Sequence, residues 1–231
     1  MDLPSSYVDK LKALQRQLAS KVRLEPFSGP LGFIGGADVA YVGPWAIGVV
    51  VVMRWPDLQL IDMGRAVELV SFPYVPGFLS FREVSVLVEA YYATVKRPEL
   101  LLVDGQGIAH PRGIGLASHL GVMLGIRTIG CAKEVLIGKA NPPGRKRGAY
   151  SPLVFEGKTI GVLLRTKESV KPICVSPGHR IDLWGSIRWT LESTRGARLP
   201  EPIRMAHQLA QMSKALFLKA EAPGPVGPRR R

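Results

Sequence analysis

Apolar residues recur every three to four positions near the start of the chain, which predicts an amphipathic helix over residues 7–22. Three short apolar runs follow, at residues 31–41, 45–54 and 58–63. Turn-forming Gly-Pro and Pro-Asp pairs separate these runs. Short apolar runs joined by tight turns predict three strands of an antiparallel meander.

Helical and strand-like patterns alternate along the rest of the chain. We expect strands over residues 100–104, 127–131, 159–165 and 173–175, and helices over residues 80–95, 115–124, 180–194 and 202–218. Residues 141–152, rich in proline, glycine and basic residues, are expected to form a loop. The pattern therefore predicts an α/β fold with a mixed sheet, an antiparallel meander followed by parallel strands, flanked by helices.

The chain has 231 residues, of which 46% are hydrophobic, so it can bury a sizeable core and is not a disordered chain. It contains no internal repeat and no linker, and residues 1–221 are expected to form one domain. Residues 222–231 combine proline, glycine and arginine, which predicts a disordered basic tail. Such a tail either contacts nucleic acid or is simply solvated.

Basic residues outnumber acidic ones by 31 to 18, which gives a formal net charge of +13. This excess favours a polyanionic partner, with nucleic acid as the first candidate and an anionic membrane surface as the alternative. No stretch is long and apolar enough to span a bilayer, and no signal peptide is apparent, so we expect a cytoplasmic protein. Cys131 and Cys174 lack metal-ligand spacing; the sequence leaves a disulfide open, but buried free thiols fit a reducing compartment better.

Carboxylates stand at several predicted ends of strands and helices. Asp104 ends a short apolar strand just before two glycines, where it either caps a turn or faces a ligand site. Asp38 lies inside a strand pattern, so it is either on the surface or buried with a partner. Glu83 follows Ser80 by three residues, which fits either a helix-capping box or a site residue.

Together, Asp38, Glu83 and Asp104 form a set of oxygen ligands of the kind that Mg²⁺ prefers. Metals held by such carboxylates stabilise the attacking and leaving oxygens of a phosphodiester. A histidine beside the metal would serve as acid or base, but spacing alone does not favour His207 over other histidines. Lys133 follows another predicted strand, where it is either exposed or part of the same site.

Two further segments suggest contacts with nucleic acid. Tyr74 stands between Pro73 and Pro76 on a stiffened loop, where it is either a wedge for a base stack or a filler of a hydrophobic gap. Residues 176–180 precede a predicted helix, so their amides are expected to hold a phosphate at its N-terminus. The expected contacts in this segment are Ser176, Gly178, His179 and Arg180.

Six segments, in order, resemble the endonuclease V family of deoxyinosine-directed nucleases. They are residues 36–41 (GADVAY), 72–83 (FPYVPGFLSFRE), 104–112 (DGQGIAHPR), 130–133 (GCAK), 176–179 (SPGH) and 200–207 (PEPIRMAH). The FPYVP and DGQG elements are the most specific of these. The departures are small: Ala37 stands where the family more often has a larger apolar residue, and the terminal tail has no counterpart.

This resemblance implies a ribonuclease H-like fold and assigns roles to individual residues. Asp38, Glu83 and Asp104 would be the metal-binding acids, with His207 and Lys133 completing the catalytic set. The strand-separating wedge would be Pro73, Tyr74, Val75 and Pro76, and the lesion pocket would be lined by Gly77, Leu79, Gly105, Gln106 and His110. The implied cofactor is Mg²⁺, with Mn²⁺ as a substitute.

The resemblance also implies an activity. A monomeric enzyme would flip deoxyinosine, the product of adenine deamination, out of DNA and nick the second phosphodiester bond on its 3′ side. It would leave 3′-hydroxyl and 5′-phosphate ends without excising the base, which initiates DNA repair. The alternatives are a nuclease of inosine-containing RNA, another ribonuclease H-like nuclease, and a non-catalytic basic binding module. Three carboxylates facing a phosphate argue against the last, because they repel it unless a cation lies between them.

Overall fold

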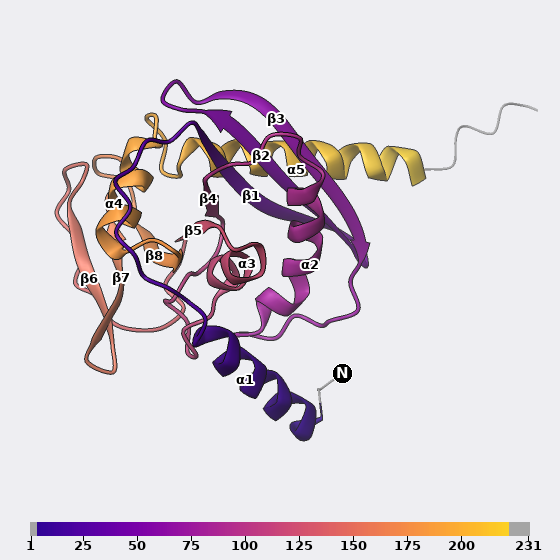
Figure 1. Ribbon diagram of the computed structural model, residues 1–231, viewed down its shortest axis with the longest axis horizontal. Coiled ribbons are helices and arrows are strands. Elements are labelled where there is room, and N and C mark those ends of the chain that lie inside the picture. Colours follow the sequence, from indigo (N-terminus) through magenta and orange to yellow (C-terminus); the bar gives the residue numbers. More distant parts are fainter. Residues whose placement is uncertain (1–3, 222–231) are drawn as a thin grey trace, which may run out of the picture.

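The computed structural model describes residues 4–221, and its strands form one eight-stranded sheet (Figure 1). The expected basic tail, residues 222–231, lies outside the described residues. The strands are β1 (Phe33–Val42), β2 (Trp45–Arg54), β3 (Gln59–Leu69), β4 (Leu100–Val103), β5 (Arg127–Ala132), β6 (Tyr150–Phe155), β7 (Lys158–Leu164) and β8 (Ile173–His179). The helices are α1 (Ser5–Ala19), α2 (Leu79–Tyr92), α3 (Leu116–Leu124), α4 (Leu183–Glu192) and α5 (Glu201–Glu221).

The order of strands across the sheet is β3-β2-β1-β4-β5-β8-β7-β6. Strands β1 to β3 form the predicted antiparallel meander, and β4 and β5 run parallel to β1. This confirms the predicted α/β fold with its mixed sheet. The last three strands differ from the expectation, because β8, β7 and β6 pair antiparallel, and the parallel pairs of the described sheet join β1, β4 and β5.

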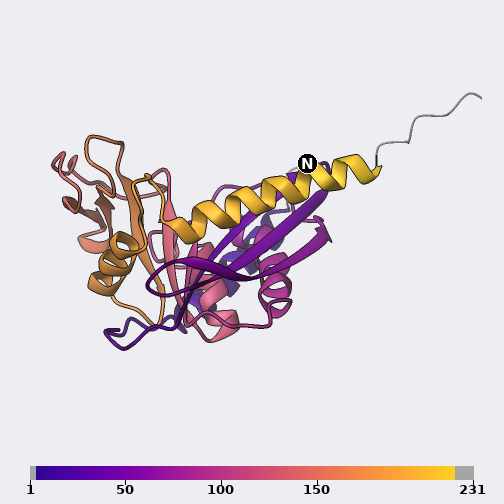
Figure 2. The same ribbon diagram turned by 90° about the horizontal axis from the view of Figure 1, so that it is seen from above.

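Helices cover both faces of the sheet. Figure 2 shows α5 along one face of the meander, while α2 lies on the opposite face. The core on the α5 side includes Ile203 and Trp189, and the core on the α2 side includes Leu87 and Leu120. Within residues 4–221, no helix has both the length and the apolar character that crossing a membrane requires.

One glycine explains how closely α5 approaches the sheet. A Cβ atom added to Gly36 in β1 would lie 2.0 Å from the carbonyl oxygen of Pro202, in the first turn of α5. Only a residue without a side chain fits there, so the start of α5 rests directly on the backbone of β1. This contact places the next turn of α5 beside the residues that follow Gly36.

The main differences from the sequence prediction lie in β3, β6 and β8, and helix α1 also begins and ends earlier than the expected residues 7–22. Strand β3 continues to Leu69, and β6 begins at Tyr150 within the expected loop, where Pro152 is tolerated because β6 is an edge strand. Strand β8 continues to His179, so the expected helix start at residue 180 is wrong. Helix α4 begins instead after Asp182, whose carboxylate accepts a hydrogen bond of 2.7 Å from the amide of Gly185.

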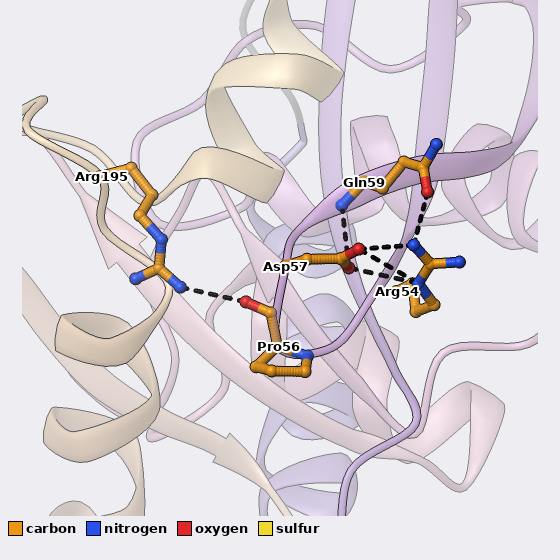
Figure 3. A network of polar contacts seen from close by, with 5 residues as sticks. All are labelled: Arg54, Pro56, Asp57, Gln59 and Arg195. Carbon is orange, nitrogen blue, oxygen red and sulfur yellow. Dashed lines mark hydrogen bonds and ion pairs between the residues drawn. The ribbon is translucent and has the colours of Figure 1, made fainter.

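The turn between β2 and β3 is held by polar contacts (Figure 3). Arg54 forms an ion pair of 2.5 Å with Asp57 and donates a hydrogen bond of 2.6 Å to Gln59. Arg195, between α4 and α5, donates to the carbonyl oxygen of Pro56 at 3.1 Å. These exposed contacts tie the turn to the opposite half of the sheet, although exposed ion pairs add little stability.

Cys131 and Cys174 are buried free thiols. Cys131 pairs with Val175 and the next residue, Ala132, pairs with Cys174. Adjacent register positions point to opposite faces of a sheet, so the two thiols face different core regions. Burial raises the pKa of both thiols to about 12, which keeps them protonated and unreactive.

Candidate active site

Two aspartates meet where strands β1 and β4 separate. Ala37 and Val103 are the last paired positions of these parallel strands, and the amide of Asp104 still donates a 3.1 Å hydrogen bond to the carbonyl oxygen of Ala37. Asp38 and Asp104 therefore occupy the next matching positions. Their side chains are only 12% and 14% exposed, respectively, so both carboxylates are largely shielded from solvent.

Glu83 approaches the same place from α2. Its Oε1 accepts a 2.8 Å hydrogen bond from the hydroxyl of Tyr41 in β1, and Arg82 lies over the Tyr41 ring at 4.6 Å. Burial, aided by the negative charges of Asp38 and Asp104, raises the pKa of Glu83 to about 7, against the opposing effect of the Tyr41 hydrogen bond. The three carboxylates therefore share one electrostatic environment.

The capping-box alternative for Glu83 is wrong. Helix α2 begins at Leu79 after Phe78, and no side chain caps its first turn. Ser80 lies inside the helix with its hydroxyl buried and without a hydrogen-bond partner among the described residues. Glu83 points instead to Tyr41 and the aspartates. Sequence reasoning missed Tyr41, although it belongs to the GADVAY segment.

The expected histidine and lysine each bond to one aspartate. Nδ1 of His207, on α5, lies 2.7 Å from Oδ2 of Asp38, and Nζ of Lys133 lies 2.7 Å from Oδ2 of Asp104. Both side chains are about half exposed, so they stand between the buried carboxylates and solvent. The structure thus places His207 beside the acids, whereas residue spacing in the sequence did not distinguish it from the other histidines.

The donor chemistry of this cluster fits a divalent cation. Burial and the charge of Asp104 raise the pKa of Asp38, while its bond to His207 opposes that shift. Each carboxylate has a protein partner at one oxygen, and residues 4–221 contain no group of three side chains already arranged around one metal position. The charge of Asp104 raises the pKa of Asp38, and both aspartates raise that of Glu83, so a hard cation such as Mg²⁺ would stabilise the ionised forms of these carboxylates.

A cavity of about 350 Å³ adjoins Asp104 and Lys133. It is lined by the expected pocket residues Gly77, Leu79, Gly105, Gln106 and His110, by Tyr74 and Pro76, and by Glu134, Val135 and Leu136. Pro73 and Val75 do not line it, although they belong to the same loop. The residues after Lys133 were missed, and their only sequence signal was an apolar pair, Val135 and Leu136, one residue beyond the GCAK segment.

Two side chains at this cavity have clear roles in its shape. Tyr74 is 68% exposed, so the gap-filling alternative is wrong and its ring is available to a ligand. Gln106 has its amide fixed, because Nε2 donates to the carbonyl oxygen of Glu134 at 2.8 Å and Oε1 accepts from the Cys174 thiol at 3.4 Å. The cavity therefore has an exposed aromatic ring, that of Tyr74, at its rim and a fixed polar side chain, that of Gln106, in its wall.

Residues 176–180 do not form the expected phosphate site at a helix start. Ser176 and Gly178 are buried in β8, where Ser176 Oγ accepts a 2.9 Å hydrogen bond from the amide of Gly107. His179 pairs with Thr128 near the start of β5, at the opposite end of the strands from Asp104, which follows the end of the parallel strand β4. Ser176 supports the loop after Asp104 instead, and contacts of His179 and Arg180 with DNA stay a prediction.

Known proteins match this chain over most of its length. The family model for endonuclease V matches residues 16–208. Endonuclease V of Dictyoglomus thermophilum is 38% identical over 226 residues, which cover 96% of this chain and 99% of that protein. The solved endonuclease V of Streptomyces avermitilis is 39% identical with a TM-score of 0.87, covering 91% of this chain and 94% of that one.

A third relative, also solved, contains nucleic acid. Endonuclease V of Ciona intestinalis, 25% identical with a TM-score of 0.79, covers 93% of this chain and all of that one. Its structure is a complex with a 23mer DNA that contains an inosine followed by a ribo-adenosine. The matched motifs, the shared fold and the extent of these similarities show that this chain belongs to the endonuclease V family.

Proposed function

We propose that this protein is a metal-dependent endonuclease that recognises deoxyinosine in DNA and nicks the second phosphodiester bond on its 3′ side. The observation that carries the proposal is the convergence of Asp38, Glu83 and Asp104 beside a base-sized cavity. Its volume of about 350 Å³ is near the lower end for sites that bind small molecules. One site thus combines a place for a flipped base with acids for phosphodiester chemistry.

Asp38, Glu83 and Asp104 would hold the Mg²⁺ ion, and Mn²⁺ offers the same oxygen-seeking chemistry. When bound, the ion would supply Lewis-acid stabilisation of the negative charge that develops on the phosphate. Tyr41 contributes by donating to Glu83 and favouring its ionised form. This matters because the pKa of Glu83 is about 7 even with the Tyr41 bond, so any loss of that bond would favour the protonated form at neutral pH.

His207 and Lys133 supply the remaining groups. The bond between Nδ1 of His207 and Asp38 orients the ring and leaves Nε2 to exchange a proton with the attacking water or the leaving oxygen. Lys133 is half exposed, so its ammonium can turn from Asp104 toward a phosphate oxygen. The products would carry 3′-hydroxyl and 5′-phosphate ends, and the nick would initiate repair.

The basic charge and the exposed loop favour a nucleic-acid substrate. A net charge of +13 attracts the phosphate backbone, and the exposed Tyr74 can stack where a base has left the helix. The inosine-containing DNA in the Ciona relative supports the same substrate class. The cavity then accepts the extruded base while the strand passes the carboxylates.

The test is a cleavage assay with an end-labelled duplex that contains a single deoxyinosine. The matched control is the same duplex with adenine at that position, and each is incubated with Mg²⁺, with Mn²⁺ or with a chelator. We expect a single nick at the second phosphodiester bond on the 3′ side of deoxyinosine. DNA ligase should be able to reseal this nick after annealing. Equal cleavage of both duplexes, or cleavage in chelator, would contradict the proposal; faster cleavage of a matched inosine RNA would assign RNA as the substrate.

A further inference from the structure

Three hydrogen-bond donors converge on the carbonyl oxygen of Gly77, at the end of the loop that carries Tyr74. Nε2 of Gln15 lies 2.9 Å from this oxygen, Nε2 of His110 lies 3.0 Å away and Nη2 of Arg112 lies 2.6 Å away. A carbonyl oxygen has two lone pairs, so this carbonyl is fully engaged by its neighbours. Gly77 itself has a φ of +78°, a conformation that favours glycine.

The three donors are also connected to one another. Nε of Arg112 donates to Oε1 of Gln15, and the backbone amide of Arg112 donates to Nδ1 of His110 at 3.2 Å. Because Nδ1 of His110 accepts, its ring proton is on Nε2, which donates to Gly77. Arg112 also stacks over the ring of Phe78 at 4.6 Å, which holds its guanidinium in place.

Gln15 links this network to the first helix. The buried face of α1 consists of Leu11, Gln15 and Leu18, and Gln15 has no exposed surface. A buried amide is costly unless its polar atoms are satisfied, and here both ends are engaged. Arg112 is a donor only, so it determines that the oxygen of Gln15 faces Arg112 and the nitrogen faces Gly77.

We propose that Gln15, His110 and Arg112 form a clamp on the Gly77 carbonyl that positions the Tyr74 loop for strand separation. This makes α1 part of the lesion-recognition apparatus and Gln15 a positioning residue. Gly77 also lines the cavity, so the same clamp fixes one wall of the pocket. Holding both in place before DNA arrives reduces the ordering cost of binding. The effect on DNA cleavage rests on the proposed function, whereas the clamp itself does not.

The first experiment measures cleavage of the duplex that contains one deoxyinosine. Gln15→Met keeps the size of the side chain but removes both hydrogen bonds, and we expect KM to rise about tenfold with kcat within about twofold. Leu11→Ala is the matched control, because it loosens the same face of α1 without touching Gly77. It should lower the melting temperature and leave KM near the wild-type value. An unchanged KM in Gln15→Met would overturn the positioning role.

The second experiment needs no substrate. Hydrogen–deuterium exchange of a peptide spanning residues 72–80 should speed up at least several-fold in Gln15→Met and remain as in wild type in Leu11→Ala. Arg112→Met breaks the same clamp without changing a residue of α1, so it replaces Gln15→Met if that variant does not fold. Unchanged exchange in this peptide overturns the clamp. If exchange is faster in Gln15→Met but the wild-type protein does not cleave the deoxyinosine duplex, the clamp is supported. In that case only the proposed function is overturned.

Discussion

Asp38 and Asp104 occupy matching positions on neighbouring parallel strands, one residue beyond the last pair, Ala37 and Val103. The spacing of the two carboxylates therefore depends on strand pairing rather than on a flexible loop. This arrangement places two like charges close together, and the charge of Asp104 raises the pKa of Asp38. Such a pair is costly to keep without a cation, which supports the proposal of a metal-dependent site.

We predict that Asp104→Ala abolishes strand cleavage while binding to inosine-containing DNA is largely retained. Loss of metal-assisted charge stabilisation should cost several kcal/mol of barrier, a reduction in rate of about a thousandfold or more. The measurement is single-turnover cleavage together with binding by fluorescence anisotropy. Asp57→Ala is the control, because Asp57 is exposed and pairs only in the turn between β2 and β3. An Asp104→Ala protein that is folded and cleaves within tenfold of wild type would refute the assignment.

The Tyr41 hydroxyl sets part of the pH dependence. Its hydrogen bond to Glu83 favours the carboxylate, so Tyr41→Phe removes a contribution that lowers the pKa of Glu83. A hydrogen bond to a charged group contributes roughly 1.5 kcal/mol, or about one pKa unit. Glu83 must be ionised to bind a cation, so the acid limb of the pH–rate profile should move upward by up to about one unit.

This shift is measured from cleavage rates between about pH 5 and about pH 9, a range that brackets the raised Glu83 pKa of about 7, at constant subsaturating Mg²⁺. Tyr41→Phe keeps the ring beneath Arg82, and the melting temperature of the variant reports any loss of packing. A uniform loss of rate at every pH, with no movement of the limb, would show that Tyr41 acts only in packing.

The sequence predicted the aspartates of the site because the boundaries of apolar runs are local information. Asp104 follows a run of four buried residues, and the pairing of β1 with β4 then brings it to Asp38. Glu83 was ambiguous, because the Ser80 pattern is the same whether the helix starts there or one residue earlier. Only the backbone of Phe78 and the position of Tyr41 decide that question.

Other features depend on partners that are remote in sequence. Gln15 is one polar residue on an amphipathic helix, and its bond to Gly77 spans 62 positions. Strand β6 contains Pro152 and exposed positions because it lies at a sheet edge, so its composition is close to that of a loop. Ser176 and His179 were misplaced because nothing local shows that β8 continues past Val175 along β5.

His119 should make the protein less stable in mild acid. It is buried on α3 beside Phe81, its Nδ1 has no hydrogen-bond partner among the described residues, and burial lowers its pKa to about 4. The unfolded chain, with a histidine pKa of about 6.5, binds the proton that the folded protein excludes. The contribution of His119 to the free energy of unfolding is therefore greatest above pH 6.5 and falls as the pH decreases toward 4, by about 2 kcal/mol at pH 5.

Denaturant unfolding of wild type and His119→Leu at pH 7 and pH 5 tests this prediction. The decrease between the two pH values should be smaller in the variant by about 2 kcal/mol, whatever its stability at pH 7. His110, whose pKa burial also lowers to about 4, should account for part of the decrease that remains. If both proteins lose the same stability, His119 is not responsible for the acid sensitivity.

The exposed ring of Tyr74 leads to a prediction about substrate form. If it stacks where the lesion leaves the helix, Tyr74→Ala should weaken binding and cleavage of duplex inosine DNA by about ten- to a hundredfold, since base–aromatic stacking contributes roughly 1–3 kcal/mol. A single-stranded substrate needs less separation, so it should be affected less. Because the side chain is 68% exposed, the melting temperature should hardly change.

The decisive quantity is the ratio of cleavage rates on duplex and single-stranded DNA, measured on the same preparations. Tyr74→Phe keeps the stacking face and should retain the wild-type ratio, which separates stacking from the hydroxyl. Tyr92→Ala removes a tyrosine of similar exposure at the far end of α2 and should leave the ratio unchanged. If Tyr74→Ala lowers both rates equally, the ring assists binding in general and does not separate the strands.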